Sequence, residues 1–446
     1  PLEIIQAIRS ATGPDFPIIF RITLDPIVPG IRDKAETLEV LKILDKSGIS
    51  ALDVDCGVYE SIDHIFPSYY LEEGCALYAT DWVKEAGITL PVLNAGNLSP
   101  KVAAKAIEDG RIDIALFGRP LIADPQMPNK LLCDQEEDIR PCIKCNMGCL
   151  HRGYTRYGNL SCAVNPECSY ERRVLSVRPC QVEEKVAIIG SGIAGLEAAR
   201  MAAQRGAKVT VYEKSDIIGG TARLIATPDW KYRFRELFVW YERQMKKLGV
   251  EIRLNTPINA DSPELADATR ILVATGSLPI VPPISGIKNS NVFNVLDVHR
   301  SMSVVKGDNV VVCGGGMSGC ELALELAEEG KKVTIVDMMP AVAQDAARFN
   351  GMTLMQKLAA LSVDIKVNTK VVAFNENGVV AECNGESMVI PADTIVHAFG
   401  IKPNNELGFE LMKKYPGIVQ IIGDAEKVNC IYDAVHSGYN AGVSIY

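Results

Sequence analysis

The amino-acid sequence predicts an α/β protein that combines the C-terminal half of a TIM (β/α)8 barrel, a metal-binding linker and two interleaved Rossmann-like dinucleotide-binding domains. Three observations lead to this fold class. Short apolar runs alternate with helical patterns before residue 130, a strand–glycine turn–helix–strand pattern occurs twice after residue 184, and seven of the 13 cysteines lie between Cys133 and Cys180. We therefore expect barrel strands 5–8 in residues 1–134 and a metal-binding linker in 135–184. One dinucleotide-binding domain is expected in 185–300 and 401–446, and the other, which interrupts it, in 301–400.

Four apolar runs at the start of the chain have the length and composition of buried parallel strands. They are residues 18–22, 51–57, 91–96 and 112–118, and two of the segments between them have helical apolar spacing that ends at glycine. Four such units make half of a TIM barrel, which leaves two sheet edges and an open core. Because the sequence starts with Pro1 rather than Met, we expect that it lacks its true N-terminus and that missing residues or another chain supply the first half.

Composition limits the kinds of partner. The 46 basic and 55 acidic residues give a formal charge of −9, which argues against nucleic-acid binding and against a polybasic membrane anchor. No apolar run reaches the length of about 18 residues that a membrane span needs. An odd number of unevenly spaced cysteines predicts a reducing compartment, the cytoplasm, and a metal site rather than a disulfide scaffold.

The repeated pattern is a dinucleotide-binding fingerprint, GxGxxG between a strand and a helix. In each copy an acidic residue, Glu213 or Asp337, stands 23 positions after the first glycine. The first glycine permits a tight turn, the second lets a pyrophosphate approach the backbone, and the third lets the helix pack on the strand. The acidic residue can accept hydrogen bonds from ribose hydroxyls. The glycines are Gly190, Gly192 and Gly195 in the first copy and Gly314, Gly316 and Gly319 in the second.

The surroundings of the two copies differ. After the first come Gly219 and Gly220, then ATGSLP with Thr275 and Gly276, and near the end of the sequence Gly423 and Asp424. This order resembles flavoprotein reductases in which an NAD(P) domain interrupts an FAD domain, which implies FAD on the first fingerprint and the nicotinamide cofactor on the second. Asp337 favours NADH over NADPH, because a carboxylate repels a 2′-phosphate and no arginine follows it.

Four of the clustered cysteines have the spacing C-x2-C-x3-C-x12-C, which can wrap a cuboidal 4Fe–4S cluster. They are Cys142, Cys145, Cys149 and Cys162. Zinc and plain reduced thiols are the alternatives, but zinc sites built from four cysteines often show two CxxC pairs, and here the second pair is absent. We expect Cys133, Cys168 and Cys180 to be structural.

The strand ends of the half barrel carry a second group of candidate residues. Asn94, Gly96, Gly118 and Arg119 follow the last two strands, a common phosphate site in barrels, and they form a plausible cradle for a flavin phosphate. Arg119 could instead make a structural ion pair. Tyr59 and His64 follow another strand's C-terminal end, where barrel catalysis usually takes place, although such side chains are as often packing residues.

The chain resembles the iron–sulfur branch of the old yellow enzyme family, which includes the 2,4-dienoyl-CoA reductases, the 2-enoate reductases and trimethylamine dehydrogenase. The residues that carry the resemblance are FGRPLIADP (117–125), PCIKCNMGCLHR (141–152), SCAVNP (161–166), IIGSGIAGLEAA (188–199) and IIGDA (421–425).

The resemblance implies an NADH-dependent ene-reductase in which electrons pass from NADH through FAD, the 4Fe–4S cluster and FMN to an activated C=C bond. Arg21 would contact the FMN pyrimidine, Gly96, Gly118 and Arg119 the FMN phosphate, and the four cysteines the cluster, while Gly423 and Asp424 would approach FAD. Tyr59 occupies the position of the family's proton-donating histidine, with His64 five residues later. A small unsaturated substrate and a homo-oligomer are also implied.

Two other functions stay open on the sequence. One is an amine dehydrogenase of the trimethylamine dehydrogenase type, against which the intact second fingerprint argues. The other is an electron-transfer or assembly partner that has no substrate pocket of its own.

Overall fold

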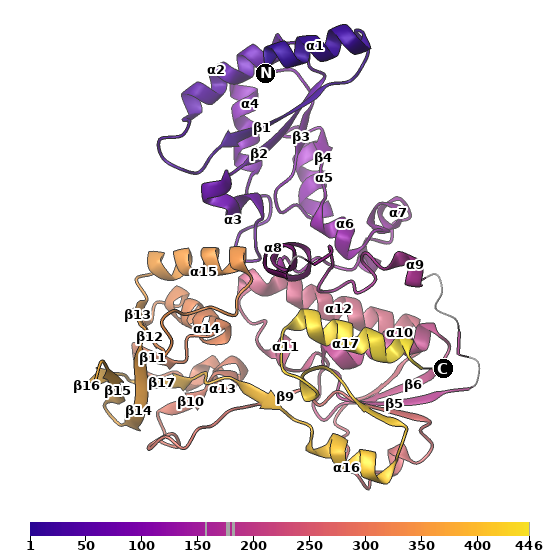
Figure 1. Ribbon diagram of the computed structural model, residues 1–446, viewed down its shortest axis with the longest axis vertical. Coiled ribbons are helices and arrows are strands. Elements are labelled where there is room, and N and C mark those ends of the chain that lie inside the picture. The colour runs from indigo at the N-terminus through magenta and orange to yellow at the C-terminus, as the bar shows by residue number, and fades with distance from the viewer. Residues whose placement is uncertain (157, 175–178, 181–182, 446) are drawn as a thin grey trace. The chain divides into compact units, whose positions relative to one another are not determined.

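The computed structural model describes residues 1–156, 158–174, 179–180 and 183–445. The chain forms two compact units, residues 1–121 and 122–446, and most of their helices and strands are labelled in Figure 1. No helix within the described residues has the length and apolar character that crossing a membrane requires. Each unit is described by itself below.

The first unit is a four-stranded, all-parallel sheet in the order β1-β2-β3-β4. Its strands are β1 (Ile19–Asp25), β2 (Ala51–Cys56), β3 (Val92–Asn94) and β4 (Ile114–Ala115), and its helices are α1 (Leu2–Thr12), α2 (Lys34–Asp45), α3 (Ile62–Ile65), α4 (Thr80–Glu85) and α5 (Pro100–Glu108), while α6 (Arg119–Ala123) follows β4. Asp33 and Glu36 form a capping box that starts α2, and Ser99 caps α5. Four parallel strands with helical crossovers confirm the predicted half barrel.

The two faces of this sheet differ in polarity. Ile22 and Leu24 on β1, like Leu52 on β2, are buried in the core formed with the helices. On the other face, the parallel register places Arg21 opposite Asp53. Because side chains alternate along a strand, the polar residues gather on the face that a barrel turns inward.

In the second unit, two five-stranded parallel sheets carry the two fingerprints. The first has the order β19-β8-β5-β6-β7: β5 (Lys185–Ile189), β6 (Lys208–Tyr212), β7 (Glu251–Arg253), β8 (Arg270–Val273) and β19 (Val419–Ile421). The second has the order β10-β17-β11-β12-β13: β10 (Val292–Asn294), β11 (Asn309–Cys313), β12 (Lys332–Val336), β13 (Asp364–Lys366) and β17 (Thr394–His397). Since β19 returns to the first sheet after the second is complete, the predicted interleaving of two Rossmann-like domains is confirmed.

Smaller sheets and helices complete this unit. An antiparallel sheet of β14 (Thr369–Asn375), β15 (Gly378–Cys383) and β16 (Glu386–Pro391) shares a hydrophobic core with the second five-stranded sheet, and β9 (Ser277–Pro279) pairs with β18 (Ile401–Pro403). The helices are α7 (Met127–Leu132), α8 (Arg152–Arg156), α9 (Glu171–Val174), α10 (Ile193–Gln204), α11 (Gly220–Leu224), α12 (Tyr232–Lys247), α13 (Val295–Arg300), α14 (Met317–Glu328), α15 (Arg348–Ala360), α16 (Glu406–Lys414) and α17 (Ile431–Val443).

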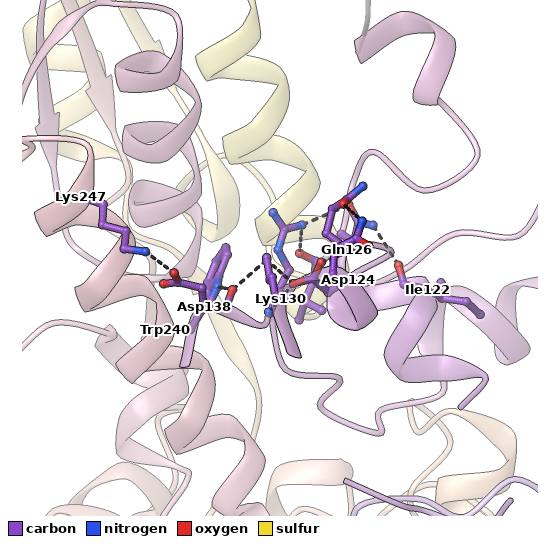
Figure 2. A network of polar contacts seen from close by, with 11 residues as sticks. Ile122, Asp124, Gln126, Lys130, Asp138, Trp240 and Lys247 are labelled. Carbon is purple, nitrogen blue, oxygen red and sulfur yellow. Dashed lines mark hydrogen bonds and ion pairs between the residues drawn. The ribbon is translucent and has the colours of Figure 1, made fainter. Parts of the chain in front are cut away.

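The start of the linker is fixed by the carboxylate of Asp124, from the FGRPLIADP segment (Figure 2). Asp124 accepts hydrogen bonds from Lys130 Nζ at 2.5 Å and from the backbone N–H groups of Gln126 and Arg140 at 3.0 and 2.8 Å. The Arg140 guanidinium in turn donates to the carbonyl oxygen of Val164 at 2.9 Å. Arg140 and Val164 flank the cysteine segment, residues 142–162, and its two ends are thereby held together.

The same network ties the linker to α12. Trp240 donates from Nε1 to the carbonyl oxygen of Asp138 at 3.1 Å, and Lys247 forms an ion pair with the Asp138 carboxylate (Figure 2). The Arg140 guanidinium lies over the Trp240 ring, with 4.7 Å to the ring centroid. The first residues of the linker, around Asp138 and Arg140, are therefore fixed to α12 within the second unit.

Substitution of Gly438 by alanine should destabilise the second unit. A Cβ atom at Gly438 of α17 would lie 2.2 Å from the carbonyl oxygen of Ala194 in α10, so the two helices would have to separate. Overpacking of this kind costs about 1–3 kcal/mol of unfolding free energy. Urea denaturation followed by circular dichroism measures the loss. Gly153→Ala is the control, because nothing lies within 4 Å of its Cβ position and alanine favours helix α8.

Candidate functional site

The first fingerprint lies between β5 and α10. A Cβ atom at Gly190, whose φ is 104°, would lie 2.4 Å from the carbonyl oxygen of Ala274, and one at Gly195 would lie 2.1 Å from that of Gly190. These two glycines are required by packing alone. At Gly192 nothing lies within 4 Å of the Cβ position, so the N-terminus of α10 is open to a ligand. Unpaired N–H groups at such a terminus attract anions, and the turn therefore fits a pyrophosphate.

Glu213 follows β6 and supports the same turn. Its Oε2 accepts hydrogen bonds from the N–H and hydroxyl of Ser191 at 2.9 and 2.8 Å, and its Oε1 accepts from those of Ser215 at 2.9 and 2.7 Å. Burial raises the pKa of Glu213, but these four hydrogen bonds outweigh burial and leave the pKa lowered. The carboxylate is thus ionised at neutral pH and fixed in place beside the open turn.

The other residues predicted for this site gather around the start of α10. Cβ atoms at Gly220 and Gly423 would lie 3.2 Å from the Gly192 Cα atom and 2.6 Å from the Ala194 Cβ atom. Thr275 and Gly276 lie two and three residues after the end of β8.

Hydrogen bonds fix the segments that carry these residues. Thr275 donates from Oγ1 to the carbonyl oxygen of Asn404 at 2.5 Å. Asp424 accepts from the N–H of Asn429 at 3.2 Å, and burial raises its pKa.

The second fingerprint repeats this geometry with one difference. Cβ atoms at Gly314 and Gly319 would lie 2.3 Å from the carbonyl oxygen of Ala398 and 2.0 Å from that of Gly314. Near Gly316, however, the carboxylate of Asp345 lies 3.7 Å from the Cβ position, and Asp345 Oδ1 accepts from the Met317 N–H at 2.8 Å. Asp345 therefore caps α14 at the place where a phosphate group would bind.

Asp337 at the end of β12 also supports its turn. Its carboxylate accepts hydrogen bonds from the N–H groups of Gly315 and Met339. Asp337 is predicted by the fingerprint spacing, but Asp345 is not. Asp345 lies in the loop after β12, and only the tertiary fold brings it onto the fingerprint.

The four predicted cysteine ligands lie together. Burial, with a smaller contribution from nearby Cys142, raises the pKa of Cys162 to about 12. Burial and neighbouring Cys149 also raise the pKa of Cys145. A Cβ atom at Gly148 would lie 2.9 Å from the Cys162 backbone, so glycine there allows the two parts of the segment to meet.

This arrangement fits an iron–sulfur cluster. Buried thiolates close to one another are unfavourable unless a cationic group compensates their charge, and the iron atoms of a cluster do so. Within the described residues, no three histidine, cysteine or acidic side chains converge closely enough for a single metal ion. A 4Fe–4S cluster instead takes each thiolate on a separate iron atom.

In the first unit, Arg21 lies on the polar face of the half barrel. Its Nη1 is 3.0 Å from Asp53 Oδ2, its Nη2 is 2.5 Å from Asp55 Oδ2, and its side chain is 56% exposed. The two aspartates therefore orient the guanidinium on the face that a barrel turns inward.

The predicted phosphate cradle lies at the ends of β3 and β4. Asn94 is buried and donates from Nδ2 to the carbonyl oxygen of Val54 at 2.9 Å, and its Oδ1 has no hydrogen-bond partner among the described residues. Arg119 Nη1 donates to the carbonyl oxygen of Pro67 at 2.6 Å. At Gly118 the Cβ position has nothing within 4 Å, whereas at Gly96 it lies 2.7 Å from the Ala76 Cβ atom. The open backbone at Gly118 fits a phosphate group.

Of the two predicted proton donors, Tyr59 is 83% exposed and His64 Nδ1 lies 3.4 Å from the buried carboxylate of Asp63. The structure adds Tyr78, which sequence reasoning missed. Its hydroxyl donates to Asp25 Oδ2 at 2.6 Å, and its pKa is raised by burial and by this hydrogen bond. Asp25 ends β1, where barrel catalysis takes place. No sequence pattern links Tyr78, in a short 3-10 helix before α4, to Asp25.

Comparison with known proteins extends these observations over the whole chain. Residues 1–137 match the NADH:flavin oxidoreductase / NADH oxidase family, and residues 184–419 match the pyridine nucleotide-disulphide oxidoreductase model. The chain is 36% identical to an NADH oxidase of Thermoanaerobacter brockii over 100% of this chain and 69% of that protein. It is 35% identical to a cinnamate reductase of Clostridium sporogenes over 99% of this chain and 68% of that protein.

A solved structure of 2-naphthoyl-CoA reductase matches 99% of this chain and 67% of its own, with 33% identity and a TM-score of 0.93. The chain belongs to the NADH:flavin oxidoreductase / NADH oxidase family, in its iron–sulfur branch related to old yellow enzyme. It is an oxidoreductase whose cofactors are FMN, FAD, NADH and a 4Fe–4S cluster. It spans about two thirds of the length of these relatives.

Replacement of Glu213 by glutamine should lower the stability of the apoprotein in a pH-dependent way. The amide places an N–H group against one serine donor, which costs about 1–3 kcal/mol. The pKa of Glu213 is lowered in the folded state, so the ionised carboxylate adds to the free energy of unfolding. This contribution is complete above the ordinary pKa of about 4.3 and is lost as the pH falls through the pKa of the folded state. Urea denaturation at pH 7, 5 and 4 should show a difference from wild type that shrinks at the lowest pH. Exposed Glu386→Gln is the control and should show no difference.

Proposed function

We propose that the protein is an NADH-dependent ene-reductase that reduces the activated C=C bond of an enoate, an enoyl thioester or an enone. The proposal rests mainly on one observation: a single chain combines a half-barrel sheet, a site of four neighbouring thiols of which Cys162 is buried, and two separate dinucleotide fingerprints. Two relatives with at least 33% identity over 99% of the chain are, by name, a cinnamate reductase and a 2-naphthoyl-CoA reductase. Both names denote reductases of conjugated unsaturated acids or their thioesters.

Each cofactor has a proposed set of residues. FAD binds at Gly190, Gly192, Gly195, Glu213, Gly220, Thr275, Gly276, Gly423 and Asp424. NADH binds at Gly314, Gly316, Gly319 and Asp337, and its pyrophosphate takes the place of Asp345 on the Met317 N–H. The cluster is held by Cys142, Cys145, Cys149 and Cys162, and FMN by Arg21, Asn94, Gly96, Gly118 and Arg119.

The protein's own contribution is binding, orientation and proton supply. When bound, the flavins and the cluster carry electrons from NADH to the substrate, because no side chain here can transfer a hydride. Arg21, oriented by Asp53 and Asp55, would offer its guanidinium N–H groups to a flavin ring that gains negative charge. The proton for the substrate's α-carbon comes from Tyr59, His64 or Tyr78, of which Tyr78 has the fixed hydrogen bond.

Domain limits, assembly and location also belong to the proposal. The limits are those expected from the sequence, except that β10 pairs with β17 and so moves the change between the two dinucleotide domains to a point before Val292. A homo-oligomer and a cytoplasmic location remain predictions, the latter supported by 13 cysteines without a disulfide.

Anaerobic titration of the full-length enzyme with NADH tests the function. Bleaching of the flavin by NADH, followed by recovery of colour on addition of an enoate, enoyl thioester or enone, is the expected result. Recovery from a panel of such compounds also identifies the substrate class. Absence of bleaching by NADH, together with bleaching by a secondary or tertiary amine, would show an amine dehydrogenase instead.

Replacement of Asp337 by serine should reduce the preference for NADH over NADPH. The variant loses a charged hydrogen-bond acceptor for the ribose, worth about 1.5–3 kcal/mol, and no longer repels a 2′-phosphate. The ratio of the two cofactors' KM values in anaerobic flavin reduction should shift about 10–100-fold. If the substitution only disordered the loop around residue 337, the binding of NADH and NADPH would be weakened equally. The exposed Asp364→Asn serves as a control with wild-type preference.

Replacement of Cys145 by serine should remove the intact cluster while the flavin of the second unit still accepts electrons from NADH. Serine is a poor ligand for iron, so the iron content should fall well below the value of about four per chain. Iron analysis and electron paramagnetic resonance of the reduced protein measure the loss. Cys168→Ser, a buried cysteine outside the proposed set, should keep its iron. Iron loss from Cys168→Ser but not from Cys145→Ser would contradict the ligand assignment.

A further inference from the structure

Three consecutive residues of α17 connect the cysteine segment with the first fingerprint. His436 Nε2 lies 2.9 Å from the carbonyl oxygen of Cys162. Ser437 accepts on Oγ from the N–H of Gly423 at 2.9 Å, and Gly438 packs directly on the backbone of Ala194. One turn of helix therefore holds parts of both sites at once.

A second group of contacts holds this side of the cysteine segment. The Tyr432 ring stacks on His436, with centroids 4.0 Å apart and planes inclined by 23°. The Tyr432 hydroxyl donates to Ser161 Oγ at 3.2 Å and accepts from the Arg152 guanidinium. Ser161 is buried and directly precedes Cys162. The position of the Cys162 peptide is thus set by α17.

The hydrogen bond from His436 has a fixed direction. A carbonyl oxygen can only accept, so Nε2 carries the hydrogen and the ring donates. The bond orients the Cys162 carbonyl and withdraws electron density from it. Hydrogen bonds and dipoles around the ligands of an iron–sulfur cluster determine its reduction potential, because reduction adds a negative charge there.

We infer that His436 is a positioning residue that fixes the Cys162 carbonyl and thereby raises the reduction potential of the 4Fe–4S cluster. Because Cys162 is a cluster ligand only under the proposed function, this role rests on it. Without the hydrogen bond, the negative end of the carbonyl dipole would no longer be compensated on a residue that would ligate the cluster, and the reduced form would be disfavoured. His436 would thus adjust the reduction potential of the cluster relative to that of its electron donor. The same helix, α17, contacts Gly423 of the proposed FAD site.

The test is a redox titration of the full-length holoenzyme, in which electron paramagnetic resonance follows the cluster. His436→Leu removes the donor, and His436→Gln retains an N–H at a similar reach. At a fixed potential the reduced-to-oxidised ratio of His436→Leu should fall about tenfold, equivalent to about 59 mV for a one-electron couple. His436→Gln should titrate near the wild type. Asn440→Ala, an exposed residue one turn further along α17, should be unchanged.

The outcomes separate this role from the proposed function. A wild-type enzyme with no iron and no cluster signal would overturn the proposed function itself. A full cluster in His436→Leu with the wild-type potential would overturn only the role of His436. If His436→Leu loses its iron, the test uses the reduction potential of the cluster in His436→Gln. A wild-type potential in that variant supports the role of His436. A shifted potential with full iron content overturns it.

Discussion

The close packing of α10 against α17 is the contact on which most of the second unit depends. It is possible only because glycines replace side chains where the helices meet: a Cβ atom at Gly438 would lie 2.2 Å from the Ala194 carbonyl oxygen, and one at Gly442 would lie 2.6 Å from the Met201 Cβ atom. α10 begins at the first fingerprint, and α17 contacts the cysteine segment through His436. The spacing between the two helices therefore also fixes the spacing between the proposed flavin and cluster sites.

The two fingerprints have the same backbone geometry but different electrostatic surroundings. At the first, Glu213 binds the serine-bearing turn from the side, and the N-terminus of α10 remains open. At the second, Asp345 already satisfies the N–H that begins α14. A pyrophosphate at the second site would have to displace the Asp345 carboxylate, whereas no side chain lies within 4 Å of the Gly192 Cβ position at the first. This difference suits a resident cofactor at the first site and an exchanging one at the second, since affinity is lowered where a bound group must be displaced.

The parts of the structure that sequence predicted are those that local chemistry determines. Gly190 and Gly314 stand at positive φ next to a neighbouring strand, and no other residue type fits there, so the pattern alone identified both turns. The contacts of Tyr78 with Asp25 and of Asp345 with Met317 join segments far apart in the chain. No spacing rule encodes such pairs, because they depend on how whole elements pack. For the same reason residues 292–294 were expected in the first dinucleotide domain, whereas β10 pairs with β17 of the second. The three residues of β10 carry no signal for the strand they pair with.

The charge around the cysteine segment follows from the chemistry of its proposed occupant. A cluster with four thiolate ligands is an anion, and burying an anion is costly unless cations lie near it. Arg140, Lys144 and Arg152 all lie on the linker within ten residues of a proposed ligand, and Arg140 and Lys144 are buried. Arg140 is itself held by Val164 and by the ring of Trp240. The Asp124 and Asp138 network therefore does more than attach the linker to α12, since it fixes the positive charge that a buried anionic cluster requires.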